Sequence, residues 1–120
     1  MAAKDQLGRA GEERAARHLT GLGYTVLDRN WRCAQGELDI VAECGTHLVV
    51  VEVKTRRSPA FGHPFEAIDE RKRRRLWQLA HAWMAAHPDL ARAREVRLEA
   101  IGIIGADPSR GALEHLVDLT

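Results

Sequence analysis

The sequence predicts a single α/β domain in which the chain runs helix, three strands, helix, two strands. Two observations support this fold class. Apolar residues recur at helical spacing over residues 4–22 and 69–87, and residues 37–55 between them have the pattern of a valine-rich β-hairpin. The chain has 120 residues, of which 45% are apolar and 29% charged, as in an ordinary globular domain. We expect one domain over residues 1–120, with a core at about 8–104 and a final strand and tail at 105–120.

Composition argues against several other classes of protein. Cys33 and Cys44 have no zinc-like spacing and the six histidines are scattered, so we expect free thiols in a reducing compartment. The first 19 residues are charged throughout and do not resemble a signal peptide. No apolar run approaches the ~20 residues that a membrane-spanning helix needs. These features predict a cytoplasmic protein with no membrane partner.

The first helix is expected over residues 4–22, closed by Gly21 and Gly23. A helical period of 100° per residue gathers one stripe on its core-facing side: Gly8, Glu12, Ala15, Ala16, Leu19 and Leu22. A carboxylate on an apolar stripe has two interpretations. Glu12 either reaches water at the open end of the stripe, or it is a further acid directed toward Asp39 and Glu52.

Residues 24–29 alternate as a first strand, and residues 30–36 are expected to form a loop that leads into the hairpin. Trp31 lies in this loop between Arg29 and Arg32. It is either a stacking surface for a nucleobase or, as is more common, a side chain packed on the edge of the sheet.

The hairpin pairs residues 37–43 with residues 47–55 around the turn Cys44-Gly45-Thr46. A two-residue loop at Gly45 and Thr46 would set cross-strand partners whose numbers sum to 91. Asp39 would then lie opposite Glu52, and Glu37 opposite Lys54. Charges on a strand of valines are costly unless they are paired or hold a metal ion, so this stretch predicts an active site.

After the hairpin we expect a surface loop over residues 56–64 and a short turn over 65–68. Asp69 is the expected N-cap of a long helix that ends near residue 87, where Pro88 stops it. Its core stripe is Leu76, Leu79, Ala80 and Trp83, continued toward the N-terminus by Lys72, with Trp77 and Met84 on the flank. Residues 88–94 are expected to be a linker, and residues 96–104 and 113–119 the last two strands.

Basic residues concentrate near the hairpin, although the net charge is only +1. Eight basic and three acidic residues lie between residues 54 and 75, whereas the stretch after residue 98 is acidic. A cationic first turn and the helix dipole both favour an anion such as phosphate. The alternative is a solvated charge run in which Glu70 pairs with Arg73 or Arg74. The candidate nucleic-acid-binding residues are Arg32, Arg56, Arg57, Arg71, Lys72, Arg73, Arg74 and Arg75.

The charged residues of the hairpin suit metal-assisted phosphodiester hydrolysis. Asp39 and Glu52 supply the hard oxygen ligands that Mg²⁺ prefers, the main-chain carbonyl of Val53 would complete the coordination, and Glu12 is a further candidate ligand. Lys54 would orient or deprotonate the attacking water, or stabilise the developing negative charge. The alternative is a cross-strand salt bridge on a solvent-facing sheet, but the valines around these charges argue against it.

The motif Asp39, twelve residues, then Glu52-Val53-Lys54 resembles the core of the PD-(D/E)XK nuclease superfamily. More closely, the chain resembles the YraN family, which is similar to archaeal Holliday junction resolvases. The matching stretches are residues 8–12, 29–32, 36–42, 51–56, 61–62 and 66–69, with Lys72, Leu76 and Ala80. The resemblance implies a restriction-endonuclease-like core with a mixed five-stranded sheet flanked by helices. It also implies catalytic residues at Glu12, Asp39, Glu52 and Lys54. Arg97-Leu98-Glu99 departs from the usual Arg-Phe-Asp of the family, which affects only a secondary contact.

These observations predict a Mg²⁺-dependent endonuclease, with Mn²⁺ as a substitute, that hydrolyses branched or structured DNA. The alternative is a nucleic-acid-binding module that keeps the fold without cleaving, and a third is a purely structural or protein-interaction domain. Because a DNA junction has near two-fold symmetry, a homodimer is expected for a resolvase. Trp77, Met84 and the last strand are the candidates for its interface.

Overall fold

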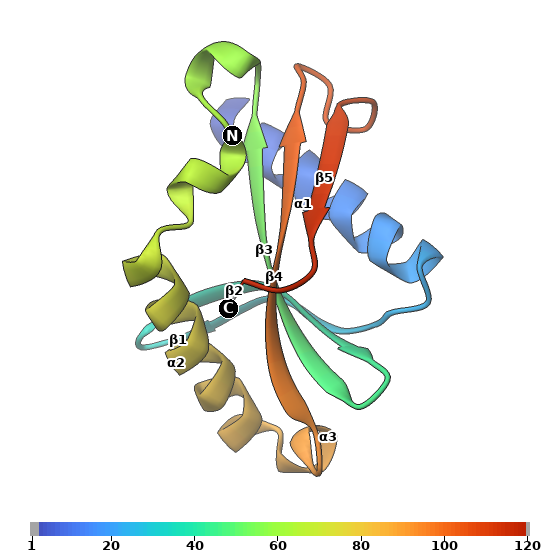
Figure 1. The fold of residues 1–120 in the computed structure, drawn as a ribbon, viewed down its shortest axis with the longest axis vertical. Helices are drawn as coiled ribbons and strands as arrows, with labels where there is room; N and C mark the ends of the chain where they lie inside the picture. Colours follow the sequence, from blue (N-terminus) through green and yellow to red (C-terminus); the bar gives the residue numbers. More distant parts are fainter. Residues whose placement is uncertain (1–2, 120) are drawn as a thin grey trace.

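The computed structural model describes the backbone of residues 3–119 and the side chains of residues 6–119. The ends of the predicted domain, residues 1–2 and 120, lie outside the described part. The chain forms one five-stranded sheet with the strand order β1-β2-β3-β4-β5, antiparallel except for the parallel pair β3 and β4 (Figure 1). The elements are α1 (Ala3–Gly21), β1 (Thr25–Cys33), β2 (Gly36–Cys44), β3 (His47–Arg56), η1 (Pro59–Phe61), η2 (Pro64–Ala67), α2 (Glu70–Ala86), α3 (Pro88–Ala91), β4 (Glu95–Ile104) and β5 (Ala112–Leu116). The predicted α/β fold with a mixed sheet flanked by helices is confirmed.

The two long helices cover opposite faces of the sheet (Figure 1). On one face, Leu76 and Trp83 of α2 pack against the sheet residues Leu38, Val50 and Leu98. On the other face, α1 packs against a second buried cluster, which includes Ala15, Leu19, Val51, Ile101 and Ile103. Because both faces of β3 are covered, a charged side chain on this strand is surrounded by apolar groups unless the sheet opens beside it.

Helix α2 begins and ends where the sequence predicts. The Asp69 carboxylate accepts a hydrogen bond of 2.8 Å from the Lys72 N–H, which satisfies one of the free donors of the first turn. The helix ends at Ala86, just before Pro88. The predicted linker after it is partly wrong, because Pro88 starts the short helix α3, where its fixed φ angle and missing N–H suit the first helical position.

The hairpin closes as predicted through Gly45 and Thr46. Gly45 takes a φ of +59°, which a glycine adopts without strain, and Cys44 pairs with His47. The register that sums to 91 is confirmed as far as Ile40 opposite Val51. Beyond that pair the ladder between β2 and β3 ends, so the predicted pairs Asp39–Glu52 and Glu37–Lys54 are not ladder partners. The two strands separate at the charged residues.

Three further expectations are corrected. Strand β1 continues to Cys33 through the predicted loop, because Asn30 accepts a φ of +54° and Trp31 still pairs with Leu38. Leu22 lies in the turn after α1 and is 58% exposed, so it does not extend the core stripe. Strand β5 ends at Leu116, three residues earlier than predicted. No helix between residues 3 and 119 is long and apolar enough to cross a membrane.

Candidate active site

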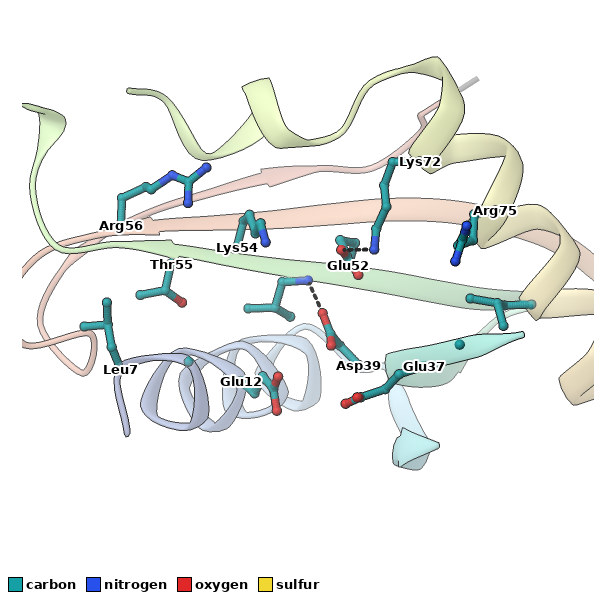
Figure 2. Close-up of a pocket in the computed structure, with 14 residues that line it drawn as sticks. Leu7, Glu12, Glu37, Asp39, Glu52, Lys54, Thr55, Arg56, Lys72 and Arg75 are labelled. Atoms are coloured by element: carbon teal, nitrogen blue, oxygen red, sulfur yellow. Dashed lines mark hydrogen bonds and ion pairs between the residues drawn. The ribbon is translucent and has the colours of Figure 1, made fainter. Parts of the chain in front are cut away.

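A cavity of about 400 Å³ opens where β2 separates from β3 (Figure 2). In Figure 2, Glu12 lies on the α1 side of β3 and Lys72 on the α2 side, with Asp39 between them. The cavity therefore reaches both faces of the sheet at the fork, the place where β2 and β3 separate beyond Ile40 and Val51. Its lining residues are Leu7, Gly8, Glu12, Gly36, Glu37, Asp39, Glu52, Val53, Lys54, Thr55, Arg56, Lys72, Arg75 and Leu79. The structure thus brings all the predicted catalytic residues together in one cavity.

A break in the alternation of β2 places Asp39 at the fork. Leu38 packs under α2, but Ile40, two residues later, packs under α1, although a regular strand would point both to the same face. The Asp39 Oδ2 atom accepts a hydrogen bond of 2.9 Å from the Val53 N–H. The carboxylate thus takes a main-chain donor of β3 that no longer has a strand partner, which satisfies that donor and holds Asp39 at the edge of β3.

Glu52 points to the α2 face of the sheet and is only 5% exposed. Its Oε2 atom lies 3.1 Å from the Nζ atom of Lys72, one of the predicted basic residues of α2. Lys54 follows on the same face of β3 and lines the same cavity. The sequence placed Lys72 on the core stripe of α2, but it did not predict this ion pair, since nothing local sets the rotation of α2 over β3.

Glu12 reaches the cavity because α1 approaches β3 closely. A Cβ atom on the preceding residue, Gly11, would lie 2.0 Å from the Thr55 Oγ1 atom, so any larger residue would force Thr55 or α1 to shift. Burial, and then the neighbouring Glu37 carboxylate, raise the pKa of Glu12, while a hydrogen bond from Asn30 opposes them. Of the two interpretations of Glu12, the cavity-facing one matches its position. Glu37 itself pairs with Arg32 at 3.3 Å instead of with Lys54.

Burial and the neighbouring carboxylates make ionisation of Asp39 at the fork unfavourable. Burial, and next the Glu52 carboxylate, raise the pKa of Asp39 to about 8, although the hydrogen bond from the Val53 N–H works in the opposite direction. The raised pKa means that the folded protein binds a proton that the unfolded chain releases near pH 4. Ionising Asp39 in the metal-free protein therefore destabilises the folded state above that pH.

Metal-free protein is expected to lose stability as the pH rises from about 4 to about 8, by a few kcal/mol, because the folded state binds more protons than the unfolded state over this range. Asp39→Asn keeps an oxygen acceptor for the Val53 N–H but has no proton to release. The variant should therefore be more stable than wild type at pH 8 and show a flatter pH dependence. Urea unfolding in a chelator at pH 5 and 8 measures this, with Asp89→Asn, an exposed acid on α3, as the control. Equal pH dependence of Asp39→Asn and wild type would contradict it.

The donor atoms at the fork fit a hard divalent cation. Asp39 and Glu52 offer carboxylate oxygens, and the Val53 carbonyl leaves the strand on the same edge as its N–H, which faces Asp39. No three His, Cys, Asp or Glu side chains among residues 6–119 are already arranged to enclose a metal ion. Mg²⁺ does not require such an enclosure, since it keeps several waters and typically takes one or two protein carboxylates. The residues present therefore fit Mg²⁺ better than a metal bound entirely by the protein.

The predicted basic residues divide among several places. Arg56, Lys72 and Arg75 line the cavity, whereas Arg73 and Arg74 line a groove on the other flank of α2. The Nε atom of Arg56 is the one buried polar side-chain atom without a partner among residues 6–119. Buried polar atoms usually have a hydrogen-bond partner, and a ligand bound in the cavity would supply the acceptor that this atom lacks.

The remaining predicted cations lie outside this cavity. Arg32 lines an adjoining hollow of about 750 Å³ that also includes Arg9 and shares Glu12 and Glu37 with the cavity. Arg57 faces a small hollow beside the start of α1, and Arg71 is exposed on α2. Trp31 packs against the cluster under α2, so the packing interpretation of this residue holds.

Sequence reasoning missed two interactions of Glu12 that shape the site. Asn30 holds Glu12, and Glu37 raises the pKa of Glu12 across the mouth of the cavity. The only local signal for Asn30 is that asparagine tolerates a positive φ better than most residues, which does not by itself predict a role at a site.

The fold and the cavity define the class of protein: a nuclease-like α/β domain with carboxylates and a lysine at the fork of its sheet. A family model described as "Uncharacterised protein family UPF0102" matches residues 11–103. The chain is 51% identical over 116 residues to a UPF0102 protein of Arthrobacter sp. (strain FB24), covering 97% of both chains. A relative from Beutenbergia cavernae is 49% identical over 97% of both chains. One from Streptomyces coelicolor is 50% identical over 96% of this chain and 88% of the relative. The chain therefore belongs to the UPF0102 family, also called YraN, which confirms the resemblance found in its motifs.

Proposed function

We propose that this protein is a Mg²⁺-dependent endonuclease that hydrolyses phosphodiester bonds in branched or otherwise structured DNA. One observation carries the proposal: Asp39, Glu52 and Lys54 meet where the sheet opens, in a cavity that is also walled by Arg56, Lys72 and Arg75. A phosphodiester is an anion that must gain negative charge to be cleaved, and this cavity combines cations with acids able to hold a metal.

Asp39 and Glu52 would hold the cation with the Val53 carbonyl, and Glu12, which lines the same cavity, would be a further ligand, directly or through water. Bound Mg²⁺ would neutralise charge on the attacked phosphate and make water a better nucleophile. The Lys54 ammonium, on the same face of β3 as Glu52, would orient the attacking water or stabilise the developing negative charge. Arg56 would donate its unpartnered Nε–H to a phosphate oxygen.

The preference for branched DNA rests on the family's similarity to archaeal Holliday junction resolvases. A junction presents two equivalent strands, so paired cuts would require two copies of the chain related by two-fold symmetry. A homodimer in the presence of junction DNA is part of this proposal.

The Lys72–Glu52 ion pair favours a second candidate function. A cation that remains on Glu52 would compete with Mg²⁺, and the protein would then bind nucleic acid through its basic residues without cleaving it. In that case the affinity would fall steeply with salt and would survive loss of Asp39.

The test is incubation of purified protein with junction, flap and duplex DNA of one sequence, in Mg²⁺, in Mn²⁺ and in a chelator. The proposal expects metal-dependent cleavage, with the junction or the flap cut faster than the duplex. Salt-sensitive binding of all three substrates with no cleavage in either metal would support the non-cleaving module instead.

A further inference from the structure

A groove on the flank of α2 that faces away from the cavity forms a second candidate site. It has a volume of about 650 Å³ and is lined by Glu70, Arg73, Arg74, Trp77, Gln78, Leu98 and Leu119. We propose that this groove binds single-stranded DNA by stacking one unpaired base on Trp77 while Arg73 and Arg74 hold the adjoining phosphates. The inference rests on the proposed function only in taking DNA as the partner.

Trp77 is presented to solvent, unlike the other tryptophans. Trp83 is fully buried and donates its Nε1–H to Asp28, and Trp31 is packed against the core. The Trp77 side chain is 43% exposed, and its ring lies 5.0 Å from the ring of His81, which also bonds the Trp77 carbonyl. A large aromatic group exposed beside an open groove is the usual form of a stacking surface for bases.

The walls of the groove complement a nucleotide. Leu98 and Leu119 are 3% and 7% exposed and provide an apolar lining beside the indole. The Arg73 guanidinium has no ion-pair partner among the described side chains, and Arg74 makes only a loose pair with Glu70 at 3.8 Å. Both arginines are therefore available to phosphates, and the combination of an aromatic face with flanking cations is what single-stranded nucleic acid requires.

The groove and the cavity lie on two sides of the same helix. Lys72 and Arg75 line the cavity, and Arg73 and Arg74, between them in sequence, line the groove. A helix with its side chains is about 10–12 Å across, so a strand of a few nucleotides can pass from one to the other over the basic turns of α2. This arrangement suits a substrate with an unpaired segment close to the bond that is cut.

A second copy of this chain fits the groove less well than single-stranded DNA does. Of the exposed large apolar residues, Trp77 lines the groove, and Leu116 and Val117 shortly precede its lining residue Leu119 in the chain; each is 42–47% exposed. A stable interface usually buries about 800 Å² on each partner and has few charges at its centre. Two arginines beside a single indole match an anion better than a protein surface.

The test measures binding of a fluorescein-labelled 12-mer of thymidine, and of a duplex of the same length, by anisotropy in a chelator. Trp77→Ala should weaken binding of the single strand by about 5- to 150-fold and change binding of the duplex less than about threefold. Trp77→Phe should restore most of the affinity, and Phe61→Ala, which removes an aromatic group that is 66% exposed elsewhere, should have no effect. Arg73→Gln with Arg74→Gln should lower the salt slope for the single strand by about 1.4.

Unchanged single-strand binding by Trp77→Ala would overturn the inference, as would a wild-type dimer that this substitution dissociates in sedimentation. Failure of wild type to bind the single strand would also overturn it. Cleavage of junction, flap and duplex DNA, measured in parallel with Mg²⁺, separates this inference from the proposed function. Trp77-dependent binding of the single strand without any cleavage would support the groove and contradict the endonuclease, whereas metal-dependent cleavage together with single-strand binding that Trp77→Ala leaves unchanged would support the endonuclease and contradict the groove.

Discussion

Replacing Glu52 with glutamine is expected to slow DNA cleavage by at least about 10³-fold while the protein stays folded. The substitution keeps the shape of a buried side chain, 7% exposed, and keeps an oxygen for the Lys72 ammonium, 3.1 Å away. It removes one of the two buried negative charges proposed to hold Mg²⁺. The effect should therefore fall on metal affinity and on rate, with little cost to packing.

Three measurements distinguish this result from unfolding. Circular dichroism should match wild type, Mn²⁺ affinity by calorimetry should fall at least about tenfold, and cleavage should be lost in both Mg²⁺ and Mn²⁺. Glu95→Gln is the matched control, because Glu95 pairs with His47 at the far end of β3, about 17 Å along the strand from Glu52. If Glu52→Gln cleaved DNA at the wild-type rate, the fork would not be the active site, regardless of what the protein binds.

Local sequence signals predicted the turn and register of the hairpin that leads to the fork. The two-residue turn at Gly45 and Thr46 set the register of β2 against β3, and the period of two placed Glu52 and Lys54 on one face of the strand. Both ends of α2 also follow from local chemistry, since Asp69 caps its start and Pro88 follows its end. These features depend on residues within a few positions of one another, which is why one sequence is enough to predict them.

The opening of the sheet at the fork has no local signal. The ladder ends after Ile40 and Val51, and Asp39 then bonds the Val53 N–H with its side chain instead of continuing the strand pairing. Extending the register therefore predicted the correct neighbours but the wrong geometry. The acids lie across the opening between β2 and β3, and they are not paired in the hydrogen-bonded ladder. The same limit applies to Lys72, whose contact with Glu52 depends on how α2 lies across the sheet.

A buried polar cluster under α1 was also beyond sequence reasoning, because its members are far apart in the chain. Glu99 is fully buried, and its carboxylate accepts hydrogen bonds from the Tyr24 hydroxyl at 2.9 Å and from the Arg97 Nε–H at 2.7 Å. The His115 Nε2 atom lies 2.6 Å from Oε1, the oxygen that also accepts the bond from Tyr24, and His18 contacts His115 in turn. Burial, and then the bond to Glu99, raise the pKa of Tyr24 to about 12, so Tyr24 remains a hydrogen-bond donor.

The position of Glu99 indicates a structural role. From the resemblance to the nuclease family, Glu99 was expected to affect only a secondary contact. In the structure it is not among the residues that line the cavity. Strand β4 contributes Glu99 between β3 and β5, where the carboxylate joins Arg97 of β4, His115 of β5 and Tyr24, the residue just before β1. A buried charge that is fully hydrogen-bonded adds little net stability, but removing it leaves its partners buried without an acceptor.

Glu99→Ala is therefore expected to lower the free energy of unfolding by about 3–5 kcal/mol, which is a large part of the stability of a domain of this size. The loss arises because the Arg97 charge and the Tyr24 hydroxyl lose their acceptor in an apolar surrounding. If this variant does not fold, Glu99→Gln, which keeps one oxygen acceptor, should fold with a loss of about 1–3 kcal/mol. Urea unfolding at constant pH measures both, with Glu114→Ala, which removes an exposed partner of His63, as the control within about 0.5 kcal/mol of wild type. A Glu99→Ala protein as stable as the Glu114→Ala control would mean that water replaces the carboxylate, and that this cluster does not hold β4 and β5 to the rest of the sheet.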